Sequence, residues 1–406
     1  MASAVVGAIT AVAFWYILQK TTGGAEELVG TGEKMSMTMK EQTILRGKRA
    51  IVIGAGPAGL AACLGLSPLC ESVVLVEKHK TFESLGSTIG LAPNGRKALE
   101  ELYPGTWDNM TKVGMETPFG GMIVPWWEMR DTLLRQVQSL SNVEMHTGER
   151  FVEAESVGDK VKVTFESDLS LEGDILIGAD GVHSGVRSWL GLPAASKTGT
   201  TVYRGHTIID SEDNPLFPLL SQGMVPLDGV FQGVFFASFN FDTKSKGKVA
   251  WVVSSQVPPE DGMTPMSLLE GKIDDDDTRE KVMELLRQSD PSHYKPFPPT
   301  SVLQREVLEE SWGGKGLVSL VGDAAHAMRP TDGQGASMAF EDAVVLCRAF
   351  RRETTIPKAL RWFESTRLPR VLRMHADQHD RYARKMRREK VGPWPDDFKQ
   401  WVFDGV

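Results

Sequence analysis

The sequence predicts an α/β protein: a Rossmann-like dinucleotide-binding domain, interleaved with an antiparallel-sheet domain and followed by a C-terminal helical region. Three observations predict this fold. A glycine-rich turn follows an apolar run near position 50, and a turn containing Gly-Asp follows another apolar run near position 320. Between them, segment 201–311 carries alternating runs rich in phenylalanine. Apolar runs that end at glycine turns are typical of buried parallel strands, whereas alternation is typical of an antiparallel sheet.

The first glycine turn has the context of a dinucleotide-binding βαβ unit. The apolar run 50–53 predicts a buried strand and leads directly into Gly-Ala-Gly-Pro-Ala-Gly at 54–59. A helix of small and apolar residues is expected over 60–69, followed by a second strand over 72–76 that ends at Glu77. This spacing places the Glu77 carboxylate where it can accept a hydrogen bond from a ribose hydroxyl. An acidic residue here favours the unphosphorylated ribose of FAD or NAD over that of NADP.

The small residues of this turn have separate physical roles. Gly54 permits the tight turn, Gly56 lets a pyrophosphate approach the backbone, and Gly59 lets the helix pack close to the strand. The start of the helix, around Ala58, then offers free N–H groups and a partial positive charge to the phosphates. We therefore predict that Gly54, Gly56, Ala58 and Gly59 bind the cofactor.

Three further motifs, taken with this turn, resemble those of the class A flavoprotein monooxygenases. The family's Asp-Gly motif is matched over 178–187, and its Gly-Asp motif is matched at Gly322-Asp323. Its Arg-x-x-Leu element is matched by Arg130, with Leu133 following. The matches fall in the family's order and span roughly Arg49 to Arg370. The resemblance implies the aromatic-hydroxylase type of fold, with FAD as the cofactor.

The resemblance also implies roles for residues around the second turn. Asp323 is expected to accept hydrogen bonds from the ribityl hydroxyls of FAD. A helix that begins near Gly333 would point its N-terminus at the flavin pyrimidine, where reduced flavin is anionic. Gly333, Gly335 and the adjoining Ala336 would let the flavin and oxygen lie against nearly bare backbone. Pro330 would lie beside the ring carbon at which oxygen reacts.

Three charged residues keep two interpretations each, and one position departs from the family pattern. Asp180 is expected either to brace the phosphate-binding region or to cap a helix. Arg130 is expected to contact pyrophosphate or ribityl oxygens, or else to be solvated on its helix. Arg204 is expected to reach the flavin edge, or else to face solvent from a strand. Ser337 stands where the family often has asparagine, which is expected to alter hydrogen bonding at the pyrimidine edge.

The reaction that the resemblance implies is a monooxygenation in which the cofactor carries the chemistry. NADPH or NADH would reduce FAD, O2 would form a flavin hydroperoxide, and one oxygen atom would pass to a small lipophilic, aromatic substrate. Only one βαβ fingerprint is visible, so the nicotinamide is expected to dock transiently. Epoxidation of an isoprenoid alkene is the main alternative. A flavin oxidase or reductase, or a non-catalytic FAD-binding chaperone of lipidated partners, also remains open.

The first twenty residues form a separate unit. From Ala2 to Leu18 there is no charged residue, Trp15 and Tyr16 lie near one end, and Lys20 follows. A span of this length is near the lower limit for crossing a bilayer. We expect a membrane anchor over 1–20 that leaves the catalytic body in the cytosol, for example on the endoplasmic reticulum. A signal peptide, and a buried or disordered extension, are the alternatives.

Composition and pattern predict the remaining organisation. The 406 residues, 41% of them hydrophobic, can bury a large core, and the formal charge of −8 argues against general nucleic-acid binding. No cysteine and histidine cluster has metal-ligand spacing, so no metal site is expected. The acidic run 274–277 is interpreted as a solvated loop. The expected divisions are a tether over 21–47, an FAD-binding domain over 48–200 and 312–350, a substrate sheet over 201–311 and C-terminal helices over 351–406.

The end of the chain is basic, and its last apolar residues have helical spacing. The basic residues of 361–390 are expected either to face anionic lipid or to lie on a solvated helix face, with the second favoured. Trp394, Phe398, Trp401 and Val402 would lie together on one side of a helix. Docking of that face on the protein itself is favoured over binding at a membrane interface.

Overall fold

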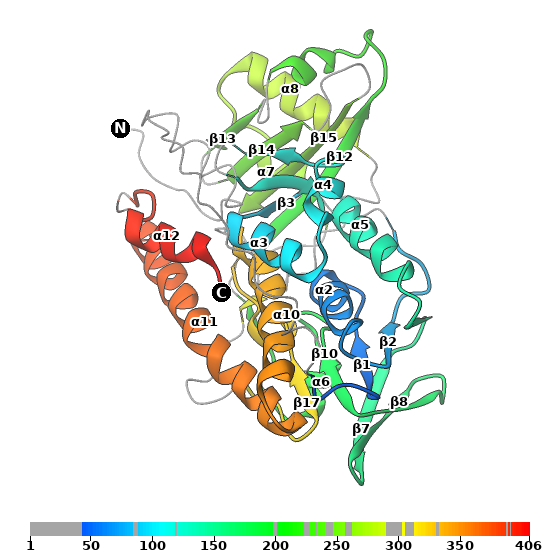
Figure 1. Ribbon diagram of the computed structural model, residues 1–406. Coiled ribbons are helices and arrows are strands. Elements are labelled where there is room, and N and C mark those ends of the chain that lie inside the picture. Colours follow the sequence, from blue (N-terminus) through cyan, green and yellow to red (C-terminus); the bar gives the residue numbers. More distant parts are fainter. Residues whose placement is uncertain are drawn as a thin grey trace.

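The computed structural model describes residues 43–83, 88–117, 120–197, 201–222, 227–231, 234–240, 247–255, 262–289, 303–304, 312–329, 333–386, 389 and 391–406. Its centre is a five-stranded parallel sheet in the order β17–β10–β1–β2–β6 (Figure 1). These strands are Val318–Leu320, Ile175–Gly178, Arg49–Ile53, Ser72–Glu77 and Val143–Thr147. The continuous apolar sequences of the inner strands follow from burial on both faces of the sheet. The predicted fold class is confirmed.

Helices and small sheets surround this parallel sheet. Helix α2 (Pro57–Leu66) is buried from Ala58 to Leu66, because it packs between the sheet and two further helices, α5 (Trp126–Gln138) and α10 (Gln334–Arg352). The remaining elements of this part of the molecule are α3 (Pro93–Leu102), α4 (Thr106–Met110), α6 (Gly185–Trp189), α9 (Asp323–His326), the sheet β3–β5–β4 (Thr88–Leu91, Met122–Pro125, Met115–Glu116) and the sheet β7–β8–β9 (Phe151–Val157, Lys160–Phe165, Ser170–Gly173).

A four-stranded antiparallel sheet lies beside the helices, at the top of Figure 1, in the order β12–β15–β14–β13. Its strands are Thr201–Ile209, Gly247–Ser255, Val234–Asn240 and Asp228–Phe231. One face, which includes Trp251 and Phe236, forms a second hydrophobic core with α7 (Pro265–Leu269) and α8 (Asp276–Arg287). The short helix η2 (Phe217–Ser221) adds to this core, and β11 (Ser196–Lys197) pairs with β16 (Leu303–Gln304).

The acidic run 274–277 is solvent-exposed, as expected, but only its first two residues precede a helix, and Asp276 and Asp277 form the first turn of α8 instead of a loop. Asp275 is the N-cap of α8 and accepts a hydrogen bond from the Thr278 N–H at 2.8 Å. Asp276 and Asp277 lie in the first turn, where negative charge interacts favourably with the helix N-terminus.

The C-terminal helices dock on the part of the molecule that contains the parallel sheet. Helix α11 (Ile356–Met386) runs along α10, and α12 (Asp396–Asp404) folds back toward α3 (Figure 1). Val402 is fully buried, and Trp394 donates a hydrogen bond to Asp377 at 2.8 Å. Helix α12 therefore packs on the protein itself, as the spacing of its apolar residues predicts. Several arginines of α11 also form internal ion pairs instead of a uniform solvated face; they include Arg361, Arg367, Arg370 and Arg381.

In the part of the chain that the structure describes, no helix has both the length and the hydropathy that crossing a bilayer requires. The expected anchor, residues 1–20, lies outside the described residues, as does the expected tether up to residue 42.

Candidate functional site

The predicted motifs lie at one edge of the parallel sheet. The glycine turn follows β1, Glu77 ends β2, Asp180 follows β10, and Gly322-Asp323 follows β17. Because β1, β2, β10 and β17 are parallel and adjacent, their carboxyl ends share this edge. Ligands of open α/β sheets bind at such an edge. The structure thus brings together motifs that are far apart in the sequence.

The glycine turn leaves no room for side chains at two positions and open space at a third. A Cβ on Gly59 would lie 1.8 Å from the Gly54 carbonyl oxygen, and one on Gly54 would lie 2.5 Å from the Ala179 carbonyl oxygen. Gly54 also has φ +105°, which favours glycine. A Cβ on Gly56 would meet no protein atom within 4 Å. The turn therefore packs tightly on its protein side and is open on the side where Gly56 begins the helix.

The two turns singled out in the sequence contact each other. A Cβ on Gly322 would lie 2.7 Å from the Ala58 Cβ and 3.3 Å from the Ala339 Cβ. Gly322 is therefore the close-approach point between β17, α2 and α10. One extended ligand can contact both turns because they meet here.

Glu77 helps to hold the glycine turn in place. Its carboxylate accepts hydrogen bonds from the Ala55 N–H at 2.8 Å and from the His79 N–H at 3.0 Å. The side chain is largely buried. A carboxylate has about four lone-pair sites, so these bonds leave capacity for a ribose hydroxyl. That contact stays a prediction.

Asp180 caps a helix, as one of its two interpretations requires. Its carboxylate accepts from the Gly185 N–H at 2.7 Å and the Val186 N–H at 3.1 Å, and from the Ser184 hydroxyl. Burial raises the pKa of this carboxyl, against the effect of its hydrogen bonds. The Asp180 Cα also lies 2.8 Å from the position of a Cβ on Gly54. The capped turn thus also packs against the glycine turn, which is expected to bind phosphate.

Arg187 belongs to this site, although no individual role is predicted for it from the sequence. It is the last residue of the Asp-Gly motif. It is buried and donates to the Val182 carbonyl at 2.6 Å and the Ala324 carbonyl at 3.4 Å. Burial lowers the pKa of its guanidinium, whereas Asp180 and Asp323 act to raise it. Arg187 therefore joins the Asp-Gly and Gly-Asp motifs. In the sequence, the signal that points to Arg187 is its position in the Asp-Gly motif, after a residue expected to cap a helix.

Asp323 remains accessible to solvent, although the residues on either side of it are buried. Burial among the surrounding protein atoms raises the pKa of its carboxyl, and His326 and Arg187 act to lower it. An accessible carboxylate at the end of a central strand can accept hydrogen bonds from hydroxyl groups of a ligand. This is the chemistry expected of a group that binds the ribityl chain.

The start of α10 also fits a ligand. Gly333 is its N-cap with φ +64°, and a Cβ on Gly335 would meet nothing within 4 Å. Ala336 is 8% exposed in the first turn. Pro330, predicted to lie beside the reacting ring carbon, lies outside the described residues.

Ser337 bonds to the start of α3, and its expected effect on hydrogen bonding at the pyrimidine edge stays a prediction. Its hydroxyl accepts a hydrogen bond from the Ala92 N–H at 3.1 Å, and a Cβ on Gly95 would lie 2.6 Å from this oxygen. The side chain is fully buried between α10 and α3. The close approach of the two helices explains the glycine at position 95, because a Cβ there would collide with Ser337.

Arg130 is buried, so the solvated interpretation is wrong. Its guanidinium donates to Asp131 at 2.7 and 2.8 Å and to the Glu83 carbonyl at 3.0 Å. It also lies over the rings of Phe82 and Trp126, at 5.1 and 5.2 Å from their centroids. These contacts fix its orientation near the end of β2. A contact with pyrophosphate or ribityl oxygens stays a prediction.

Arg204 lies on the face of the antiparallel sheet that is opposite the second core. It shares this face with His206, whose ring lies 4.6 Å from that of Trp127 at the start of α5. Burial lowers the pKa of Arg204 to about 10. The face therefore turns toward the start of α5, and the solvent-facing interpretation of Arg204 is wrong. Neither His206 nor Trp127 was predicted, because their contact depends on how two domains meet.

These residues fit FAD. Gly56 and Gly335 leave open space at two helix N-termini, where N–H groups bind anionic groups. Asp323 offers an accessible carboxylate next to Gly322, which packs on both α2 and α10, and the sheet face with Arg204 contacts the start of α5 through His206. A dinucleotide long enough to contact both turns matches this arrangement.

Comparison with known proteins also indicates an FAD-binding protein. Residues 109–378 match the model of the FAD binding domain family. The chain is 27% identical to 3-hydroxybenzoate 6-hydroxylase 1 of Aquipseudomonas alcaligenes, over 87% of this chain and 95% of that protein. It is 31% identical to the chloroplastic zeaxanthin epoxidase of Arabidopsis thaliana, over 55% of this chain and 33% of that protein. A crystal structure of a Klebsiella pneumoniae HpxO variant complexed with FAD has the same fold, with a TM-score of 0.67 and 24% identity over 88% of this chain and 95% of that one.

The chain belongs to the FAD binding domain family. Within this family it is an FAD-dependent monooxygenase, an oxidoreductase with FAD as its cofactor.

Replacing Asp323 by asparagine is expected to lower FAD affinity without lowering the stability of the apoprotein. The pKa of Asp323 is higher in the folded protein than in the unfolded chain. Ionisation of this carboxyl therefore opposes folding, and the effect develops as the pH rises from the pKa of the unfolded chain to that of the folded protein. The Asp323→Asn apoprotein should therefore unfold at the same or a higher temperature at pH 7. Its FAD affinity should fall about tenfold through loss of a charged acceptor. Thermal unfolding and FAD titration check this, and a lowered unfolding temperature would contradict it.

Proposed function

We propose that the enzyme uses NADPH or NADH and O2 to hydroxylate a small lipophilic, aromatic substrate. The observation that carries this proposal is the chemistry of the sheet face opposite the second core. Phe235, Phe239 and Val252 on this face are buried, and the register places Val252 directly opposite Arg204. A mostly apolar wall with a few polar groups is typical of a site for a small organic ligand.

The protein groups have distinct tasks in this reaction. When bound, FAD supplies the redox chemistry: it accepts a hydride from the nicotinamide and activates oxygen. The glycine turns position the cofactor, and the start of α10 offers a partial positive charge to its pyrimidine end. The apolar sheet face excludes water and holds the aromatic ring. The Arg204 cation orients a polar or acidic group of the substrate.

Two relatives support different oxygen-transfer outcomes. The match with the hydroxylase covers 87% of this chain and 95% of that protein, whereas the match with the Arabidopsis epoxidase covers 55% of this chain and 33% of that protein. Hydroxylation is therefore the favoured outcome, and epoxidation of an isoprenoid alkene is the second candidate.

The test is nicotinamide oxidation by the purified, FAD-loaded protein, with panels of lipophilic phenols and of polyprenyl alkenes, under isotopically labelled oxygen. We expect one phenol class to stimulate NADPH or NADH oxidation and to contain the label in its product. Labelled epoxide would establish the second candidate instead. A bound flavin that neither nicotinamide reduces would reject both and favour an oxidase or a non-catalytic role.

A substitution at Arg204 tests the role of the sheet face. Arg204→Gln should lower substrate-stimulated turnover about tenfold by removing a charged hydrogen-bond donor, while FAD stays bound. Lys248→Gln is the matched control, because Lys248 lies on the same face but near the start of β15, where it pairs with Glu128 at 3.5 Å. Equal losses in both variants would contradict a specific role for Arg204.

We further propose that residues 1–20 anchor the enzyme to a membrane, with the catalytic body in the cytosol. The uncharged segment from Ala2 to Leu18, with its flanking aromatic residues and Lys20, supports this proposal. Deletion of residues 1–20 should move the protein from the membrane fraction to the soluble fraction. Unchanged membrane association would reject the anchor.

A further inference from the structure

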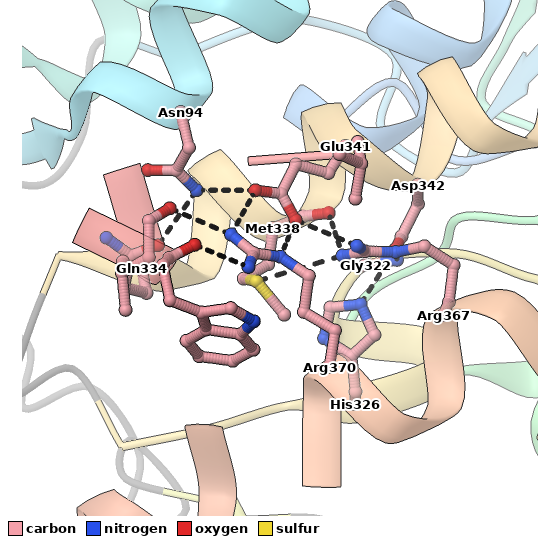
Figure 2. Close-up of polar contacts among 12 residues, drawn as sticks. Asn94, Gly322, His326, Gln334, Met338, Glu341, Asp342, Arg367 and Arg370 are labelled. Atoms are coloured by element: carbon pink, nitrogen blue, oxygen red, sulfur yellow. Dashed lines mark hydrogen bonds and ion pairs between the residues drawn. The ribbon is translucent and has the colours of Figure 1, made fainter. Parts of the chain in front are cut away.

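Two carboxylates and two arginines form a buried cluster between α10 and α11 (Figure 2). Glu341 and Asp342 are at most 1% exposed, Arg367 is fully buried, and Arg370 is 8% exposed. Arg367 donates to Asp342 at 2.7 Å and to Glu341 at 2.8 Å, and Arg370 makes two hydrogen bonds of 2.7 Å to Glu341. The two positive and two negative charges compensate each other, as buried charges require.

One end of this cluster holds the Gly-Asp turn. The second Asp342 oxygen accepts from the Gly322 N–H at 2.8 Å and lies 2.7 Å from the His326 Nε2. Gly322 immediately precedes Asp323, the residue expected to bind the ribityl chain. Asp342 therefore fixes the backbone on which that residue is placed.

The other end of the cluster holds the start of α10. Asn94 donates to Glu341 at 2.8 Å and to the Gln334 side-chain oxygen at 3.0 Å (Figure 2). Gln334 is the first residue of α10 and follows Gly333, and both amide side chains are 1% exposed. The same cluster thus positions the helix N-terminus that is expected to face the flavin pyrimidine.

Helix α12 completes the cluster from outside. Arg370 donates to the Trp401 carbonyl at 3.0 Å and to the Val402 carbonyl at 2.8 Å, and it lies 4.6 Å from the Trp401 ring centroid. Gly405 packs on Asn94, since a Cβ on Gly405 would lie 3.3 Å from the Asn94 Cβ. Helix α12 therefore contacts the cluster both at an arginine and at the amide that leads to α10.

We propose that α12 is a positioning element for the bound flavin and that Arg370 transmits its docking to the N-terminus of α10. The stabilisation of negative charge by a helix N-terminus falls off within one turn, so it depends on the placement of the first residues. Docked α12 holds Glu341, and through Asn94 the start of α10, in the position that stabilises reduced flavin. The proposal rests on FAD binding at this site and is independent of the substrate.

The test compares Arg370→Lys and Val402→Asp with Arg361→Lys as the matched control. Lysine at position 370 keeps the charge but cannot reach both Glu341 and the α12 carbonyls as a planar fork. Val402→Asp undocks α12 by placing a charge at a fully buried position, while every side chain of the cluster remains. Arg361 also lies on α11 and also donates to backbone carbonyls, of Gly314 and Val318, but outside the cluster.

The measurements are the dissociation constants of oxidised and reduced FAD and the reduction potential of the bound flavin, without substrate. We expect binding of reduced FAD to weaken about fivefold relative to oxidised FAD in Arg370→Lys and Val402→Asp. The potential should fall accordingly in these two variants and stay unchanged in Arg361→Lys. A drop in unfolding temperature with an unchanged ratio of the two constants would show a merely structural role and overturn the proposal, as would an equal shift in Arg361→Lys. These readouts need no turnover, so they are separate from the test of the monooxygenase reaction.

Discussion

Replacing Gly59 by alanine is expected to abolish FAD binding, because the glycine turn cannot form. The added Cβ would lie 1.8 Å from the Gly54 carbonyl oxygen, and no side-chain rotation relieves an overlap between backbone atoms. Either α2 moves away from β1 or the turn unfolds. We expect a loss of about 4 kcal/mol in the free energy of unfolding, at the upper end for single substitutions. Thermal unfolding of the apoprotein and FAD retention during purification measure the two effects.

Gly56→Ala is the matched control, because it separates folding from ligand binding. Gly56 has φ −78°, which any residue adopts, and its Cβ would meet no protein atom within 4 Å. The apoprotein should therefore keep its stability to within about 0.5 kcal/mol. The methyl group enters the space where a pyrophosphate would approach the backbone, so FAD affinity should fall at least about tenfold. Normal FAD affinity in Gly56→Ala would show that the cofactor does not lie against this turn.

The contrast between these two glycines shows what the sequence could predict. Gly54, Gly56 and Gly59 lie between an apolar strand and an apolar helix, so their roles follow from local spacing alone. The position of Asp323 follows from a similar pattern, because it comes directly after an apolar strand of the same parallel sheet, whereas its role is what the family resemblance implies. Patterns of this kind specify both a backbone shape and a place at the edge of a parallel sheet.

Contacts between distant helices could not be predicted in the same way. Ser337 was expected at the pyrimidine edge, but its environment depends on how closely Gly95 of α3 approaches α10. Arg130 was interpreted from its helix alone, whereas its burial follows from Asp131, Glu83 and two aromatic rings. In sequence, a buried arginine and a solvated one look alike, because only tertiary packing supplies the acceptors that make burial possible.

The arginines of α11 are the clearest example of contacts that depend on tertiary packing and that the sequence alone does not predict. Arg367 and Arg370 belong to a basic stretch that predicts a solvated or lipid-facing helix. In the structure they neutralise Glu341 and Asp342, which lie in α10 beyond the N-terminus that is expected to face the flavin. At these two positions, the basic residues therefore form buried ion pairs instead of facing solvent or lipid.

Removing the Arg367 charge is accordingly expected to have a large effect on stability. In Arg367→Met, two buried carboxylates remain but only one of the two arginines that neutralise them. This is expected to lower the free energy of unfolding by about 3–5 kcal/mol. Arg384→Met is the control on the same helix, because Arg384 forms partly exposed ion pairs with Asp380 and Glu389. Such pairs contribute at most about 1 kcal/mol. Denaturant unfolding at pH 7 measures both losses, and equal losses would contradict the buried role of Arg367.

The pH dependence of the Arg367→Met effect gives a second, independent check. Burial acts to raise the pKa values of Glu341 and Asp342, but the neighbouring positive charges outweigh it and hold both below their usual range. The pair therefore stabilises the wild-type protein above the unfolded pKa of about 4, and this contribution is lost as the pH falls through the folded values. Without Arg367, less positive charge opposes the effect of burial, so the pKa values of Glu341 and Asp342 rise. Ionisation of these two carboxyls then favours folding less than in the wild type. The stability difference between the wild type and Arg367→Met should thus be largest at neutral pH and should shrink as the pH falls below about 4. A difference that stays constant with pH would show that Arg367 acts through packing and not through its charge.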